Sequence, residues 1–208
     1  MTVLPTLVPV GTVSNTQNNF GWKNSVTFDF ERVWSYIDET GAGDDANIFT
    51  SIDVFDDLVV QLSPLPSDFG WLTSATLEIR VAVGGGGDGM AGTPSGDDRH
   101  ELHAQLEDEF GVPISDAVTV YDVNGGMAGT ILTVPFTGLR WSFSPARLRL
   151  GGVMEIVGGF DSHLRRVDFA RVNGEYTPEP AYATPYSDGA ATRRDNVFRK
   201  MYLRSTYK

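Results

Sequence analysis

Residues 72–83 read LTSATLEIRVAV, and they form the most regular alternating stretch of the sequence. Apolar side chains occupy every second position from Ala75 to Val83, whereas the polar or charged Ser74, Thr76, Glu78 and Arg80 have the opposite parity. A period of two is typical of a strand with one buried and one solvated face. A proline-containing turn precedes this stretch and glycines 84–87 follow it, which marks both ends. The pattern therefore predicts a central strand.

The rest of the chain contains further short segments of strand character, separated by glycine and proline turns. The expected strands are Ser25–Phe30, Val33–Ile37, Asn47–Ile52, Leu58–Leu62, Arg99–Asp108, Val118–Tyr121, Ile131–Phe136, Ala146–Leu150, Val153–Val157 and Arg166–Val172. Helical periodicity is weak everywhere, with Asp188–Met201 as its one candidate. Many short strands with turns between them predict an all-β fold, a two-sheet antiparallel β-sandwich that is jelly-roll-like.

The alternation of apolar and polar positions also predicts which strands pair and which side chains form the core. Residues 99–108 alternate as the central strand does, so we expect them to pair with residues 74–83 as a hairpin whose tip is the glycine-rich loop 84–98. The expected core side chains are Leu77, Ile79, Val81, Leu102, Ala104, Leu106, Leu148 and Leu150.

Length and composition indicate one sizeable domain. The chain has 208 residues, 41% of them hydrophobic, and no cysteine, so packing without disulfides must stabilise the fold. We expect the sandwich to span residues 20–172, with 1–19 as an N-terminal arm and 173–208 as an extended C-terminal arm. The first residues, MTVLPTLVPVG, have no basic region and are too short to cross a bilayer, which predicts a soluble protein without a signal peptide.

Charge is distributed unevenly along the chain. The net charge is −11, yet residues 1–180 carry −15 and residues 181–208 carry +4. An acidic body disfavours nucleic acid and membrane surfaces as main partners, although the basic tail alone could bind either. The basic tail also holds aromatic anchors, so we expect it to dock on an acidic surface of another subunit or partner protein. The residues expected to make this contact are Arg193, Arg194, Phe198, Arg199, Lys200, Tyr202, Arg204 and Tyr207.

Catalytic and cofactor motifs are absent from the sequence. Gly84–Gly87 lacks the lysine and hydroxyl residue of a phosphate loop, and no cofactor is expected. His100 and His103 are three residues apart on a strand, so they point to opposite faces and cannot share a metal ion easily; His163 stands alone. Both strand histidines are interpreted as solvated strand or strand-edge residues. Loop carboxylates such as Asp44 and Asp45 leave a calcium site open, although none has EF-hand spacing.

One block of the sequence resembles a known class of proteins. Residues 34–51, WSYIDETGAGDDANIFTS, and 56–83, which end in GWLTSATLEIRVAV, are similar to segments of small all-β structural proteins of tailed bacteriophages. Residues 99–108 followed by GVPISD look like the next strand of those proteins. The matching positions, interpreted as fold signatures, are Asp38, Glu39, Asp44, Asp45, Leu72, Thr73 and Leu77.

The resemblance implies a virion component, either a capsid decoration protein or a tail or neck accessory protein. It implies no catalysis, a place in the phage particle, and partners that are other virion proteins and other copies of the chain, with a homotrimer expected by analogy. A glycan-binding jelly-roll module is the alternative, with a tryptophan platform drawn from Trp22, Trp34, Trp71 and Trp141. An enzyme would need a carboxylate pair among the loops.

Overall fold

The computed structural model describes residues 1–15, 22–24, 32–37, 48–51, 55–84, 99–140, 144–155 and 164–179. These residues form eleven strands and one short 3-10 helix, η1 (Val33–Tyr36). The strands are β1 (Thr2–Leu7), β2 (Pro9–Asn15), β3 (Lys23–Asn24), β4 (Ile48–Ser51), β5 (Phe55–Leu62), β6 (Phe69–Gly84), β7 (Arg99–Glu107), β8 (Val118–Asn124), β9 (Met127–Pro135), β10 (Arg147–Glu155) and β11 (Leu164–Pro178).

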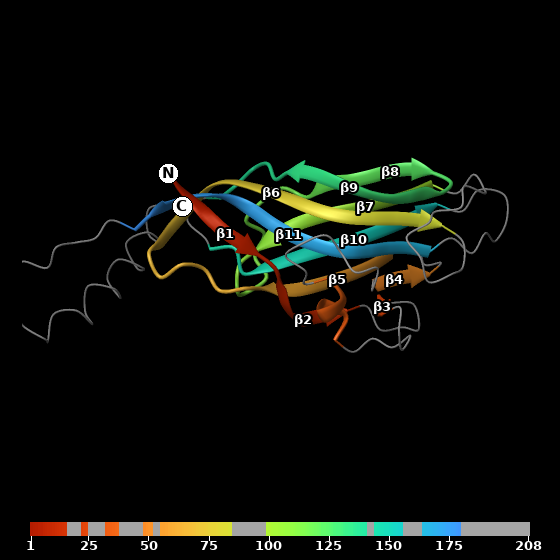
Figure 1. Cartoon of the computed structure of the whole chain (residues 1–208), viewed down its shortest axis with the longest axis horizontal. Helices are drawn as coiled ribbons and strands as arrows, with labels where there is room; N and C mark the ends of the chain where they lie inside the picture. The colour runs from red at the N-terminus through yellow and green to blue at the C-terminus, as the bar shows by residue number, and fades with distance from the viewer. Residues whose placement is uncertain are drawn as a thin grey trace, which may run out of the picture.

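Two antiparallel sheets make up this fold. The first sheet has the order β3-β4-β11-β6-β9, with β1 also paired to β11, and the second has the order β2-β5-β10-β7-β8. The long strands β6 and β11 run along the length of the molecule, and β8 and β9 follow one of its borders (Figure 1). The predicted all-β, two-sheet β-sandwich is confirmed.

The core lies between the two sheets and includes the side chains that parity placed inward. Leu77, Ile79 and Val81 of β6 are fully buried. The other predicted core residues, Leu102, Ala104, Leu106, Leu148 and Leu150, are buried as well. Side chains of β6 in the first sheet therefore meet side chains of β7 and β10 in the second sheet, and all of them belong to one hydrophobic cluster.

The predicted hairpin between residues 74–83 and 99–108 is wrong. β6 pairs with β11 and β9 in the first sheet, whereas β7 pairs with β10 and β8 in the second. Each of the two strands has one apolar face. That face is buried whether the two strands are neighbours in one sheet or lie in opposite sheets and face one another across the core. The long connection between them allows the chain to change sheets, so parity identified the buried side chains but not the pairing partner.

Two local predictions also need correction. Residues 146–150 and 153–157 were expected as separate strands, but β10 continues through Gly151 and Gly152, which keep their register with β5 and β7. Residues 33–37 were expected as a strand and instead form η1, which follows Arg32 in a left-handed conformation with φ 50°. This tight turn buries both Val33 and Ile37, which alternation also placed on one side.

Both ends of the domain differ from the predicted boundaries. The N-terminal residues are not an arm, because β1 pairs with β11 and β2 pairs with β5, and Leu4 and Leu7 are buried. The C-terminal arm does not begin at residue 173, because β11 continues to Pro178. There Tyr176 is buried and stacks on Phe69 with 5.3 Å between ring centroids. The strand predicted at residues 25–30 lies outside the described residues.

Candidate functional site

The tail residues predicted to dock on a partner lie outside the described part of the chain. These are Arg193, Arg194, Phe198, Arg199, Lys200, Tyr202, Arg204 and Tyr207. His163, Trp141 and the acidic pair Asp44 and Asp45 lie outside it as well. Candidate sites are therefore drawn from the sandwich itself.

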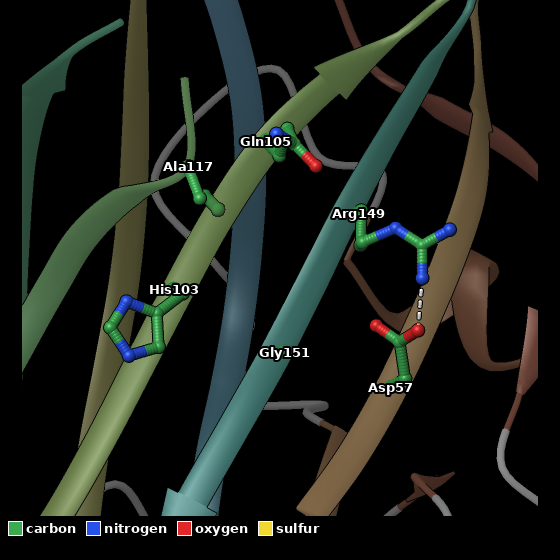
Figure 2. A pocket seen from close by; sticks show the side chains of 7 residues that line it. Asp57, His103, Gln105, Ala117, Arg149 and Gly151 are labelled. Atoms are coloured by element: carbon green, nitrogen blue, oxygen red, sulfur yellow. Dashed lines mark hydrogen bonds and ion pairs between the residues drawn. The ribbon is translucent and has the colours of Figure 1, made fainter. Parts of the chain in front are cut away.

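A shallow hollow lies on the outer face of the second sheet. It has a volume of about 150 Å³ and is lined by Asp57, His103, Ala104, Gln105, Ala117, Arg149 and Gly151. In the strand register Gly151 stands between Asp57 on β5 and His103 on β7. Because Gly151 has no side chain, the row of outward side chains is interrupted at β10, with His103 on one side and Asp57 on the other (Figure 2).

Arg149 organises the charges at one side of the hollow. Its Nε donates to Oε1 of Glu107 at 2.5 Å, and its Nη1 donates to Oδ2 of Asp57. The Glu107 side chain is only 2% exposed, so this ion pair holds a buried carboxylate. The guanidinium is thus fixed by strands on both sides of β10, which makes this part of the outer face rigid.

Burial and charge shift the pKa values of this cluster. Burial raises the pKa of Asp57 above its ordinary value, and the attraction of Arg149 does not cancel this rise. Burial lowers the pKa of Arg149. The hydrogen bond to Glu107 and the negative charge of Asp57 together raise that pKa by more, so the net shift is upward. Arg149 consequently stays charged, while Asp57 takes up a proton more readily than an ordinary aspartate.

His103 occupies the opposite side of the hollow in a second polar network. Its Nε2 lies 2.9 Å from Oε2 of Glu101, and its Nδ1 lies 3.4 Å from Oγ1 of Thr119 on β8. Arg99 in turn contacts Glu101 at 2.5 Å. The contact between Thr119 and His103 is long for a hydrogen bond, and Arg99 pairs with the carboxylate of Glu101. The network is interpreted as a surface ion cluster.

The two strand histidines point to opposite faces, as their spacing predicted. His103 lies on the outer face, whereas His100 is fully buried, so its interpretation as a solvated residue is wrong. Buried near this end of the core are also Tyr121 and Arg165, whose guanidinium approaches Gly152 of the facing sheet. Among the described residues there is no cluster of three or more metal-ligating side chains.

A rigid turn at the end of β7 presents an exposed aromatic ring. Oδ1 of Asp108 accepts the backbone N–H groups of Phe110 and Val112, each at 2.8 Å. Gly111 takes a φ of 82°, and Arg147 donates to the carbonyl of Glu109. Phe110 is nevertheless 76% exposed and Val112 is 40% exposed. We call residues 108–113 the Phe110 turn; its run Asp-Glu-Phe-Gly-Val-Pro is a turn signal that sequence reasoning did not use.

The tryptophan platform proposed for a glycan-binding module is largely unavailable in the described structure. Trp22 is fully buried and Trp34 is partly buried against the core. Trp71 alone among the described tryptophans is substantially exposed, at 37%. No described helix is long and apolar enough to cross a membrane.

Comparisons with known proteins detect similarity of structure only, because no protein-family profile and no curated protein sequence matches the chain. One neighbour is the enzymatically active domain of tailspike protein 4 from bacteriophage CBA120 (12% identity, TM-score 0.38, covering 81% of this chain and 19% of that chain). A second is a chain from the structure of infectious bursal disease virus, Gt strain (15%, 0.33, 78% and 46%). A third is a xylan-binding module (10%, 0.35, 84% and 98%).

These neighbours include phage and viral proteins, but the similarity is distant. The chain spans less than half the length of the first two. With TM-scores below 0.4, the neighbours assign no function to this chain.

Proposed function

We propose that this chain is a non-enzymatic structural protein of a tailed-phage virion, serving in capsid decoration or as a tail or neck accessory. It acts by self-association and by docking on other virion proteins. The resemblance of residues 34–83 to small phage structural proteins supports the class. The Phe110 turn is the observation that carries the docking function.

An exposed aromatic ring on a pre-ordered turn is suited to protein binding. Backbone hydrogen bonds from Phe110 and Val112 to Asp108 already fix the turn, so docking would order little further chain. Aromatic anchors commonly supply most of the affinity of a protein interface. Arg147, which donates to the carbonyl of Glu109, supplies a charged group at the turn. The turn thus combines an apolar centre with a polar border.

The substitution Phe110→Ala tests this function. Removing an anchor residue of this kind weakens binding to purified particles by about 30-fold if it costs about 2 kcal/mol. The free energy of unfolding should stay close to that of the wild type, because the ring is 76% exposed. Val3→Ala is the control, since Val3 is equally exposed on β1 and lies outside the turn. Wild-type binding by the Phe110 variant, or absence of the chain from purified particles, contradicts the proposal.

Glycan binding in the hollow is the second candidate function. Asp57, Gln105 and Arg149 place carboxylate, amide and guanidinium groups around it on an open sheet face. Gly151→Val places a side chain at the hollow, and its Cβ would make only an ordinary contact with Oδ1 of Asp57 at 3.7 Å. Calorimetric titration with a panel of neutral polysaccharides should show binding that this variant loses. If the wild type binds none of them, this candidate is excluded.

A further inference from the structure

Strand β9 stands at one end of the described strand order of the first sheet. Among the described strands it pairs only with β6, and residues 130–134 keep an unbroken register with β6. The sequence between Asp122 and Arg140 contains no charged residue, although the chain as a whole has a net charge of −11. Ile131 in the middle of this segment is 53% exposed. An exposed, uncharged and regular edge is a template for pairing with another strand.

The other edge strands have features that oppose such pairing. β1 contains Pro5 and β2 contains Pro9, and both have register shifts. β3 is only two residues long and includes Lys23, and β8 has a register shift and an exposed Asp122. β9 has a register shift at its start and a proline at its end, but residues 130–134 between them have neither. This segment is therefore the least protected edge described.

The backbone of β9 shows which groups face outward from the edge. Just beyond β9, the N–H of Phe136 donates to the carbonyl of Ala75 at 2.9 Å, so Phe136 points its backbone groups toward β6. Alternate residues of an antiparallel ladder share this direction. Leu132 therefore points its N–H and C=O toward β6, whereas Ile131 and Thr133 point theirs to the open side.

We propose that β9 pairs antiparallel with β9 of a second copy of this chain, about a two-fold axis at Leu132. In this register Ile131 of one copy exchanges backbone hydrogen bonds with Thr133 of the other, which uses the outward groups of both strands. Leu132 lies opposite its own counterpart, and Ile131 becomes covered. The pairing is isologous and joins two first sheets into one continuous sheet.

Charge favours a second copy as the occupant of this edge. Two chains that each carry −11 repel one another, and an uncharged edge meeting its own copy brings no like charges together at the contact. The proposed two-fold contact is an alternative to the homotrimer expected from the resemblance, which stays a prediction. It does not depend on a virion role, because a dimer can form whether or not the chain binds particles.

The mass of the purified full-length chain in solution tests the pairing. Sedimentation equilibrium across the micromolar range should show a monomer–dimer equilibrium. Ile131→Lys should raise the dissociation constant about tenfold or more, because each dimer contains the substituted pair twice. Val13→Lys is the matched control, since Val13 is a 42% exposed valine on the edge strand β2. A monomer at all concentrations, a trimer, or equal loss with both variants overturns the proposal.

A cysteine at the axis tests the register. The chain has no cysteine, so Leu132→Cys can form only intermolecular disulfides. Directly opposed residues have Cβ atoms about 4.5–5.5 Å apart, which is near the separation a disulfide needs. Thr130→Cys is the control in the same strand, because the axis at Leu132 keeps the two copies of residue 130 well apart. Mild oxidation should give a covalent dimer for Leu132→Cys alone; no dimer, or equal yields, overturns the register. Circular dichroism checks that both variants fold.

Discussion

Neighbouring glycines of β10 should respond oppositely to the same substitution. A Cβ on Gly152 would lie 2.5 Å from Nη1 of Arg165 and 2.9 Å from its Cζ, and Arg165 is only 1% exposed. A Cβ on Gly151, which faces outward, would meet only Oδ1 of Asp57 at 3.7 Å, an ordinary contact. Gly152→Ala should therefore destabilise the fold, and Gly151→Ala should not.

The expected loss of stability depends on how far the guanidinium of Arg165 can move away from the added Cβ. The end of an arginine side chain normally moves aside easily, but Arg165 is enclosed between the two sheets. Forcing extra volume into a packed interior costs about 1–3 kcal/mol. Disturbing the contacts of a buried charge adds to this, while replacing a strand glycine recovers about 0.5–1 kcal/mol. We expect Gly152→Ala to lower the free energy of unfolding by about 2 kcal/mol, and Gly151→Ala to raise it by about 0.5 kcal/mol.

Equilibrium unfolding in urea measures both effects, and a double-mutant cycle identifies their cause. In the background Arg165→Met, which removes the guanidinium, the cost of Gly152→Ala should shrink by more than the usual non-additivity of about 0.5 kcal/mol. If Gly152→Ala is as stable as the wild type, the guanidinium does not pack against β10 as described. If both glycine variants lose the same stability, backbone conformation and not Arg165 sets the requirement for glycine.

Two further predictions concern the core. Ile79→Ala should lower the free energy of unfolding by about 2–5 kcal/mol in urea titrations, because Ile79 is fully buried between the sheets. Burial raises the pKa of Tyr121 far above its ordinary value of 10.0, so at high pH the native state holds a proton that the unfolded state has lost. Stability should consequently fall as pH rises past the ordinary pKa of tyrosine, and Tyr121→Phe should reduce this fall in unfolding measured across an alkaline pH series.

Parity predicted which side chains are buried but not which strands are neighbours. Leu77, Ile79 and Leu102 are in the core as expected, because alternation along one strand depends only on local geometry. The pairing of residues 74–83 with 99–108 failed because two strands with matching faces can lie side by side or face to face. Choosing between these arrangements depends on long-range contacts, here those of β6 with β11 near the other end of the chain.

The features of the candidate site were only partly visible in the sequence. The hollow exists because Gly151 falls between Asp57 and His103, and this register joins three strands that are distant in sequence. The Phe110 turn is local, and its aspartate, glycine and proline were available as a turn signal. The turn is a candidate docking site because Phe110 is exposed, and this exposure could not be predicted from the sequence.

The uncharged segment that includes β9 can be interpreted only when the position of β9 in the sheet is known. Read alone, the absence of charge between Asp122 and Arg140 is what a buried strand would show, and Ile131 would be assigned to the core. In the structure that strand is an edge, and Ile131 points outward beside Arg80 of β6. Apolar side chains that do not serve the chain's own core are then available to a second surface. The same residues that look ordinary in a central strand therefore become the strongest indication of self-association once the strand order is known.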